Sequence, residues 1–249
     1  MSIKFEETVT PSPEQWKAVI MGTRNAMNSW NRSDTMICGV LKCNDCKLWN
    51  IKPNALEGTC LEENGFYVGP NDHDLLMRLC RAGESHRKFM RMLLVYVTIT
   101  APLYWWKEFD TYKVGTVCNS CSTMHKVHAK EFTMEDFSCE HLTSRSKERL
   151  EDTIDDLNYY RNLYLNGGND FFSDSDDVDY EPKDKHIWWQ IIQLLPSSYN
   201  QKRTIMLNYE VLANMYKSRK NHKLDEWVEL CKWIETLPYS ELITGEFDV

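Results

Sequence analysis

Residues that could bind an anion are concentrated between positions 107 and 126. Lys107, Lys113 and Lys126 supply cations there, and His125 adds an imidazole. Together they would supply the local positive field that a chain with a net charge of −8 otherwise lacks. The segment therefore predicts a basic pocket for a negatively charged ligand. The commoner alternative for such a run is a solvated charged face.

A second candidate lies near the C-terminus, where Asn208 and Arg219 are separated by close to three helical turns. On one helix their side chains would share a face with Leu212 and Met215. An apolar stripe with polar ends suits a planar base, and arginine offers a fixed fork of donors for a phosphate. The favoured alternative is a core stripe that ends in an exposed arginine, where a cation suits the helix dipole.

Other reactive side chains point to fewer functions. His86 lies between an expected helix end and an expected strand, where functional residues often lie, although a single histidine is more often structural. Cys118 and Cys121 have the spacing of a metal or redox pair, but no second pair lies at a suitable spacing from them, so plain thiols are favoured. The hydroxyl residues at 120–123 lack an Asp–His partner, which argues against a hydrolase triad. No glycine-rich phosphate loop of the Walker or Rossmann type is present.

Four further cysteines lie near the N-terminus, at Cys38, Cys43, Cys46 and Cys60. The two-residue gap between Cys43 and Cys46 is typical of a structural zinc site, in which thiolates close a loop around the metal. The flanking spacings match no standard zinc finger. Reduced thiols are therefore favoured over zinc at these four positions.

The composition is that of a folded cytosolic protein. Hydrophobic residues make up 42% of the chain and aromatic residues 12%, which favours a packed core over disorder. No apolar run reaches the roughly 18 to 20 residues that span a bilayer, and the N-terminus lacks the apolar region of a signal peptide. The net charge disfavours non-specific binding to nucleic acids. Part of that charge is concentrated in an acidic loop at about 167–185.

The elements that would position these residues mix helices with a modest amount of strand. Ser12, Pro13 and Gln15 form a helix start with a capping box. Further helices are expected from Asn71 or Asp72 to Gly83 and over 104–112, 144–165, 186–195, 203–219 and 224–237, with a strand over 93–100. Strands and helices do not alternate regularly, which predicts an α+β fold. One domain over 1–249 is expected, with a cysteine-containing insert at about 31–69.

The segment after the expected strand resembles the signature region of the flavin-dependent thymidylate synthases, the ThyX family. Ala101-Pro102 matches an Ala-Pro of that family, and Lys107-Glu108-Phe109 stands where the family has Arg-Gln-Trp. Thr111-Tyr112-Lys113 replaces the family's Arg-His-Arg motif, and Thr116 replaces the serine that follows it.

The resemblance continues on both sides of this motif. After a one-residue insertion, Asn119-Ser120 stands at the family's Asn-Glu, Ser122 matches its next serine, and Met124-His125 stands at its Arg-Tyr. Upstream, His86 falls on the histidine that precedes the family's Pro-Phe-Glu-His.

The C-terminal part resembles the family more closely. The family's order of Leu-Pro, Asn, Leu, Arg, His and Glu is matched by Leu195-Pro196, Asn208, Leu212, Arg219, His222 and Glu226. Glu210 reverses the charge of a family arginine. The resemblance covers about 71–242, roughly two-thirds of the chain.

The resemblance implies a central, mostly antiparallel sheet flanked by helices, in a homotetramer whose active sites are shared between subunits. It implies FAD as the cofactor and methylation of dUMP to dTMP, with methylenetetrahydrofolate and NADPH as co-substrates. Reduced flavin then mediates the one-carbon transfer to C5 of dUMP, and no protein cysteine attacks the base. The protein contributes orientation and charge.

The resemblance also implies roles for individual residues. Arg219 and Ser122 would take part in catalysis. The nucleotide would contact Glu108, Lys113, Asn119, Ser120, Ser122 and Arg219. The flavin would contact His86, Thr111, Tyr112, Lys113, Asn208, Asn214 and His222.

The altered motif leaves alternatives open. Thr111 and Tyr112 remove a cation and an imidazole from the flavin contact region, while Lys113 keeps the last charge as a point charge rather than a fork. Tyr112 could instead stack on the isoalloxazine ring. The alternatives are hydroxymethylation or another one-carbon transfer to a different pyrimidine nucleotide, and a non-catalytic descendant that binds a nucleotide or a partner. The divergence also fits a viral or phage gene.

Overall fold

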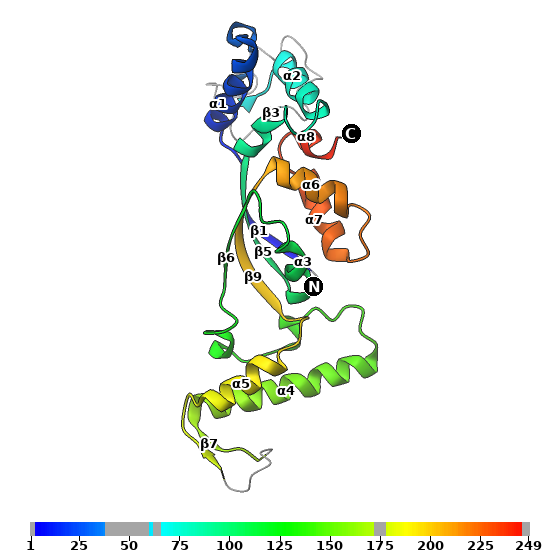
Figure 1. Cartoon of the computed structure of the whole chain (residues 1–249). Coiled ribbons are helices and arrows are strands. Elements are labelled where there is room, and N and C mark those ends of the chain that lie inside the picture. The colour runs from blue at the N-terminus through cyan, green and yellow to red at the C-terminus, as the bar shows by residue number, and fades with distance from the viewer. Residues whose placement is uncertain (1–2, 38–59, 62–65, 172–177, 246–249) are drawn as a thin grey trace. The chain divides into compact units, whose positions relative to one another are not determined.

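The chain forms an α+β fold around a four-stranded antiparallel sheet, as predicted (Figure 1). The computed structural model describes residues 3–37, 60–61, 66–171 and 178–245. The sheet has the order β1-β5-β9-β6. Its strands are β1 (Lys4–Val9), β5 (Leu94–Pro102), β9 (Asn200–Asn208) and β6 (Thr116–Ser120).

β5 is the strand predicted from its β-branched and aromatic residues. Val95, Val97, Ile99 and Ala101 alternate along it and are fully buried, while Tyr96 between them is exposed. This alternation is that of an inner strand with one face on the core. Pro102 is its last residue and also the N-cap of the following helix, so the strand ends two residues later than the predicted 100.

The described residues divide into two compact units. Unit 1 comprises 1–6, 98–111 and 118–204, and unit 2 comprises 7–97, 112–117 and 205–249. The expectation of one domain with an insert stays a prediction. Within the described residues, no helix is both long and apolar enough to cross a membrane.

Unit 1 is built on two helices that lie side by side, α4 (Ser144–Asn166) and α5 (Lys185–Leu194), preceded by α3 (Leu103–Phe109) (Figure 1). Thr143 caps α4, and Gly167, with a φ of 71°, ends it. The core contains Val127, Phe132, Phe137, Leu150, Ile154, Leu157 and Ile191. The short strands β7 (Gly168–Asn169) and β8 (Asp179–Tyr180) pair at the ends of the predicted acidic loop.

Unit 2 contains the remaining helices. They are α1 (Pro13–Arg24), α2 (Pro70–Arg81), α6 (Tyr209–Arg219), α7 (Asp225–Glu235) and α8 (Glu241–Thr244), with short 3-10 turns, among them η4 (Lys88–Met92). The predicted capping box of Ser12 and Gln15 is present at the start of α1. Trp16 is fully buried and packs against Phe66, Tyr209 and Tyr239, so one aromatic residue joins four segments of this unit.

A buried ion pair joins α1 to α2. The Arg24 Nε donates to Asp72 Oδ1 at 2.5 Å, and the two side chains are 4% and 0% exposed. Asp72 also accepts from the Ser33 hydroxyl and from the backbone N–H groups of Asp34 and Thr35. Burial alone would raise the pKa of Asp72, but the hydrogen bonds from Thr35, Ser33 and Arg24 outweigh it and lower that pKa.

The prediction of one helix over 203–219 was wrong over 203–208. Residues up to Asn208 belong to β9, and α6 begins only at Tyr209. Gln201, Ile205 and Leu207 are buried on one face of β9, which is the period of a strand. The strand lies between β5 and β6 in the sheet, and this pairing overrides the helical propensity of the segment.

The segment 31–69, expected as a cysteine-containing insert, contains short strands in its described residues. Its described ends form the short antiparallel strands β2 (Met36–Ile37), β3 (Cys60–Leu61) and β4 (Phe66–Tyr67), in the order β2-β4-β3. Residues 38–59 and 62–65 lie outside the described part of the chain.

Candidate functional site

Unit 2 brings together two of the predicted site residues, Arg219 and Tyr112. The Arg219 Nε donates to the Tyr112 hydroxyl at 3.0 Å, although the residues are 107 positions apart. The guanidinium carbon lies 4.6 Å from the centroid of Trp227 and 5.7 Å from that of Tyr112. The Tyr112 and Trp227 rings meet edge to face at 5.9 Å. We call Tyr112, Arg219, His222 and Trp227 the arginine cluster.

His222 joins the cluster through its ring. Its centroid lies 6.2 Å from that of Trp227 in an edge-to-face contact, and its Nδ1 accepts from the Leu224 N–H at 3.2 Å. This bond fixes Nδ1 as an acceptor. Trp227 on α7 is fully buried, so its ring is held in place. The guanidinium of Arg219 and the imidazole of His222 pack against this ring. A cation over an aromatic face is attracted by the ring quadrupole.

The helical stripe predicted from Asn208 to Arg219 is a core stripe in its middle. Leu212 and Met215 are fully buried, so they present no face to a base. Asn208 lies just before α6 as its N-cap and accepts from the Val211 N–H at 2.9 Å. A Cβ at Gly115 would come within 2.6 Å of the Asn208 amide nitrogen, so the backbone of 115 lies directly against this side chain.

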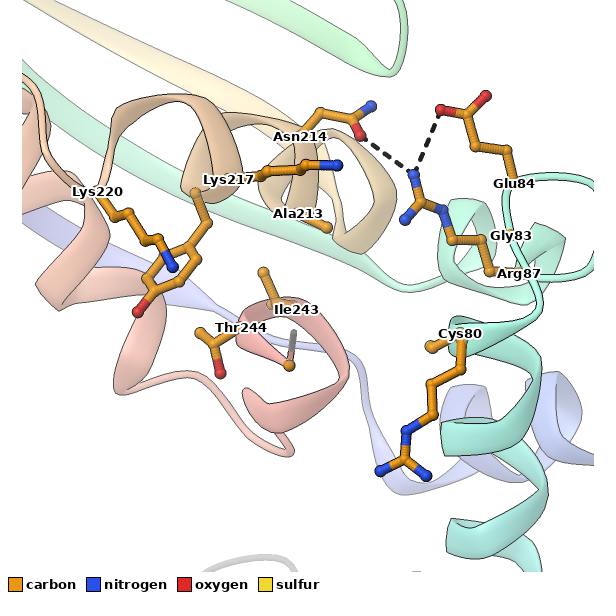
Figure 2. A pocket seen from close by; sticks show the side chains of 13 residues that line it. Cys80, Gly83, Glu84, Arg87, Ala213, Asn214, Lys217, Lys220, Ile243 and Thr244 are labelled. Atoms are coloured by element: carbon orange, nitrogen blue, oxygen red, sulfur yellow. Dashed lines mark hydrogen bonds and ion pairs between the residues drawn. The ribbon is translucent and has the colours of Figure 1, made fainter. Parts of the chain in front are cut away.

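Asn214 lies apart from Asn208, on the rim of a pocket of about 430 Å³ (Figure 2). Its Oδ1 accepts from the Arg87 Nη2 at 3.2 Å. Residues from α2, the turn after it, α6 and the end of α8 line the pocket: Cys80, Arg81, Gly83, Glu84, Arg87, Ala213, Asn214, Tyr216, Lys217, Lys220, Ile243, Thr244 and Gly245. None of the four residues expected to form a basic pocket, Lys107, Lys113, His125 and Lys126, lines this one.

The other residues assigned by resemblance lie at turns and on exposed strands. In unit 1, the Thr111 hydroxyl donates to the carbonyl of Glu108 at 2.7 Å, and the Ser122 hydroxyl oxygen accepts from the N–H of His125. Asn119 and Ser120 are exposed on β6. In unit 2, Lys113 and His86 are exposed, and His86 lies in the turn that follows Gly83.

The described thiols show no metal site. In 3–37, 66–171 and 178–245, no three His, Cys, Asp or Glu side chains form a group that could hold a metal. Cys118 and Cys121 are free, and burial raises the pKa of the Cys118 thiol. Cys38, Cys43 and Cys46 lie outside the described residues, and only the backbone of Cys60 is described, so the zinc hypothesis stays untested.

Sequence reasoning missed several residues that shape these two places. Trp227 follows the matched Glu226 directly, but its role becomes visible only when α7 packs beside Arg219. Lys217 and Lys220 follow Asn214 at intervals of three, which is a helical-face signal that could have been used. Arg87 carried no signal of its own, because its partner Asn214 is 127 positions away.

Two arginines near the pocket, Arg87 and Arg91, lie beside Glu210, the residue that stands where the ThyX family has an arginine. Its carboxylate accepts from Arg91 through both Nε and Nη2, the second at 3.2 Å. Arg87 Nε lies 3.8 Å from Glu210 Oε1, which is an ion pair but too long for a hydrogen bond. The acidic charge at 210 is therefore met by arginines of the segment 87–91.

Comparison with known proteins relates the fold to solved structures. No protein-family model matches the sequence, and no curated protein matches it by sequence. A structure of flavin-dependent thymidylate synthase ThyX from Helicobacter pylori, complexed with FAD and dUMP, is similar with a TM-score of 0.57 and 14% identity, over 99% of this chain and 98% of that one. A second structure of ThyX from Helicobacter pylori with FAD and dUMP gives a TM-score of 0.55 and 15% identity, over 99% and 97% of the two chains. The chain therefore has a ThyX-like fold.

Proposed function

We propose that this protein is a flavin-dependent enzyme that methylates dUMP to dTMP. Methylenetetrahydrofolate would donate the one-carbon unit and NADPH would reduce the flavin, in a homotetramer with shared active sites. The full-length likeness to ThyX structures that contain FAD and dUMP supports this proposal. The observation that carries it is the Arg219–Tyr112 hydrogen bond, because it joins the two segments in which the family resemblance lies.

In this proposal, Arg219 binds the anionic nucleotide. A guanidinium presents several donors in a fixed plane, and one of them is already used by Tyr112. That bond and the Trp227 ring hold the plane in one orientation before the nucleotide arrives, which lowers the entropy lost on binding. Tyr112 is then a positioning residue that acts through Arg219, rather than a ring for the flavin to stack on.

The residues assigned to FAD fit it unevenly. Thr111 and Asn208 do not fit, because the hydroxyl of the first donates within its own turn and the amide of the second caps α6. Asn214 and His222 fit better, since each is oriented by a neighbour and each lies at a surface of unit 2. Bound FAD would supply the redox step, while these side chains would orient it.

Product analysis tests the reaction. We would incubate the protein with dUMP, FAD, NADPH and methylenetetrahydrofolate and identify the nucleotide by mass spectrometry. Flavin-dependent formation of dTMP supports the proposal, and a hydroxymethyl product would mean that the altered motif redirects the transfer. Unchanged dUMP, together with no dUMP binding, would reject it in favour of a binding protein.

A binding series tests the role of Arg219. Arg219→Ala should weaken dUMP binding by about 1.5–3 kcal/mol, because a charge-assisted contact is lost. Arg78→Ala is the control, since Arg78 is exposed on α2 and pairs only with Asp74 of the same helix among the described residues. Tyr112→Phe should weaken binding less than Arg219→Ala, because the ring stays. Equal dUMP affinity in Arg219→Ala and the wild type would refute the assignment.

A further inference from the structure

The pocket beside Asn214 has a charge opposite to that of the whole chain. Four cationic side chains line it, Arg81, Arg87, Lys217 and Lys220, against the single carboxylate of Glu84. Figure 2 shows Lys217 and Lys220 on one side, on α6 and just after it, and Arg87 on the other. In a chain with a net charge of −8, such a concentration favours an anionic ligand.

Arg87 contributes a buried hydrogen-bond donor to this pocket. The side chain is 10% exposed, and its buried Nε makes no hydrogen bond among the described residues, although it forms a longer ion pair with Glu210 Oε1 at 3.8 Å. Its Nη2 donates to Asn214 and lies 3.5 Å from Glu84. A buried donor without a hydrogen bond costs free energy until an acceptor comes within hydrogen-bond distance. A ligand oxygen at this point would remove that cost.

The neighbouring acidic groups neutralise the pocket only in part, through Arg87. Glu84 is 75% exposed, so water screens its pairing with Arg87. Glu210 lies outside the pocket lining, where Arg91 donates to both of its oxygens, and only its longer ion pair with the Arg87 Nε reaches a lining residue. Within the described residues, Arg81, Lys217 and Lys220 form no ion pair. The positive charges of three of the four cations are therefore not neutralised by the protein and can attract an anionic ligand.

The rest of the lining is suited to an organic group attached to the anion. Cys80, Ala213 and Ile243 form an apolar part of the wall, and burial raises the pKa of the Cys80 thiol to about 12, so this thiol adds no negative charge. The Tyr216 hydroxyl donates to Glu235 at 2.8 Å, and this bond holds the Tyr216 ring at the edge of the pocket. A volume of about 430 Å³ is in the range of small-molecule sites and suits a nucleotide-sized ligand.

We propose that this pocket is a phosphate-binding site that takes the diphosphate group of a nucleotide through Arg87, Arg81, Lys217 and Lys220. A diphosphate carries enough oxygens to accept from the buried Nε and from the lysines at once. FAD and a simple nucleoside diphosphate such as ADP share this group. The inference does not depend on the one-carbon reaction, because a non-catalytic nucleotide-binding protein would use the pocket in the same way.

Calorimetric titration of the full chain with inorganic pyrophosphate tests the site. The wild type should bind it, with an affinity that falls as salt rises. The double variant Lys217→Gln, Lys220→Gln should bind about tenfold or more weakly. These side chains are exposed, so the variant keeps its fold. Lys17→Gln, an exposed lysine of α1 outside the pocket, is the control and should bind as the wild type does. Arg87→Met should lose most of the affinity, and its unfolding curve would show whether the fold is kept.

Further titrations separate the sources of the diphosphate and the two proposals. Tighter binding of FAD than of ADP, with the same loss in the lysine variant, would identify the flavin cofactor as the ligand. Equal binding of both would identify a general nucleotide site. Absence of pyrophosphate binding at millimolar concentration, or an equal loss in Lys17→Gln, overturns the inference. Arg219→Ala should leave pyrophosphate binding unchanged, so a failure of the dUMP proposal would leave this result intact.

Discussion

The substitution Asp72→Asn should destabilise the fold strongly, because it leaves a buried charge without its partner. Asp72 is fully buried and accepts four hydrogen bonds, from Arg24, Ser33, Asp34 and Thr35. Arg24 is 3% exposed, and its Nη2 already has no hydrogen-bond partner among the described residues. The positive charge of the Arg24 guanidinium therefore depends on the Asp72 carboxylate for its neutralisation.

The size of the effect follows from burial. Removing one partner of a buried pair costs about 3–5 kcal/mol, since the remaining ion stays out of water. The asparagine side chain would also place its NH₂ group, a donor, opposite hydrogen-bond donors that now donate to the Asp72 carboxylate. The matched control is Asp74→Asn on the same helix, where Asp74 and Arg78 are 67% and 62% exposed. Such an exposed i,i+4 pair contributes about 0.5 kcal/mol or less.

The assay is urea unfolding followed by tryptophan fluorescence at several pH values. The folded pKa of Asp72 lies below its unfolded value of about 3.9, so the pair stabilises the fold fully above that value. That stability is lost as the pH falls through the folded pKa. The difference between wild type and Asp72→Asn should therefore be constant near neutral pH and shrink in acid.

Equal losses in Asp72→Asn and Asp74→Asn at neutral pH would refute this reasoning. So would a difference between wild type and Asp72→Asn that grows as the pH falls below 4. Either result would mean that the pair is hydrated or that other groups compensate Arg24.

Two further predictions concern a glycine and a thiol. Gly115→Ala should cost about 1–3 kcal/mol in thermal or urea unfolding, because φ is 80° and the new Cβ would meet Asn208. Gly22→Ala, in α1 with nothing within 4 Å, should instead stabilise by about 0.5–1 kcal/mol, and destabilisation by both would contradict the distinction. Alkylation of the native protein should modify Cys121, which is exposed, and leave Cys80, whose pKa is raised to about 12 by burial, unmodified until urea is added. Peptide mass spectrometry would measure this, and rapid modification of Cys80 under native conditions would show that the pocket wall opens.

Several elements could be predicted from sequence because their determinants are local. The capping box at Ser12, the strand that ends at Pro102 and the stop of α4 at Gly167 each depend on side chains within a few residues. The α+β class followed from the order of such elements. The resemblance to the ThyX family also anticipated the fold, which the similar solved structures share.

The error at 203–219 shows where local reasoning ends. Ile205 and Leu207 alternate over too short a run to distinguish a strand from the start of a helix. Only pairing with β5 and β6 makes the segment up to Asn208 a strand. The amide of Asn208, expected to contact a ligand, then becomes the cap that separates strand from helix.

By itself, the sequence determined the nature of the chemistry that this protein can offer. Arg219, Tyr112 and Asn214 are the groups that it makes available, together with the helix α6 that carries two of them. The tertiary structure alone decided which groups meet. Arg219 and Tyr112 are 107 positions apart, and Asn214 and Arg87 are 127 apart. No local propensity encodes such contacts, because they form only when helices and strands bury their apolar faces together and bring distant polar groups to one surface.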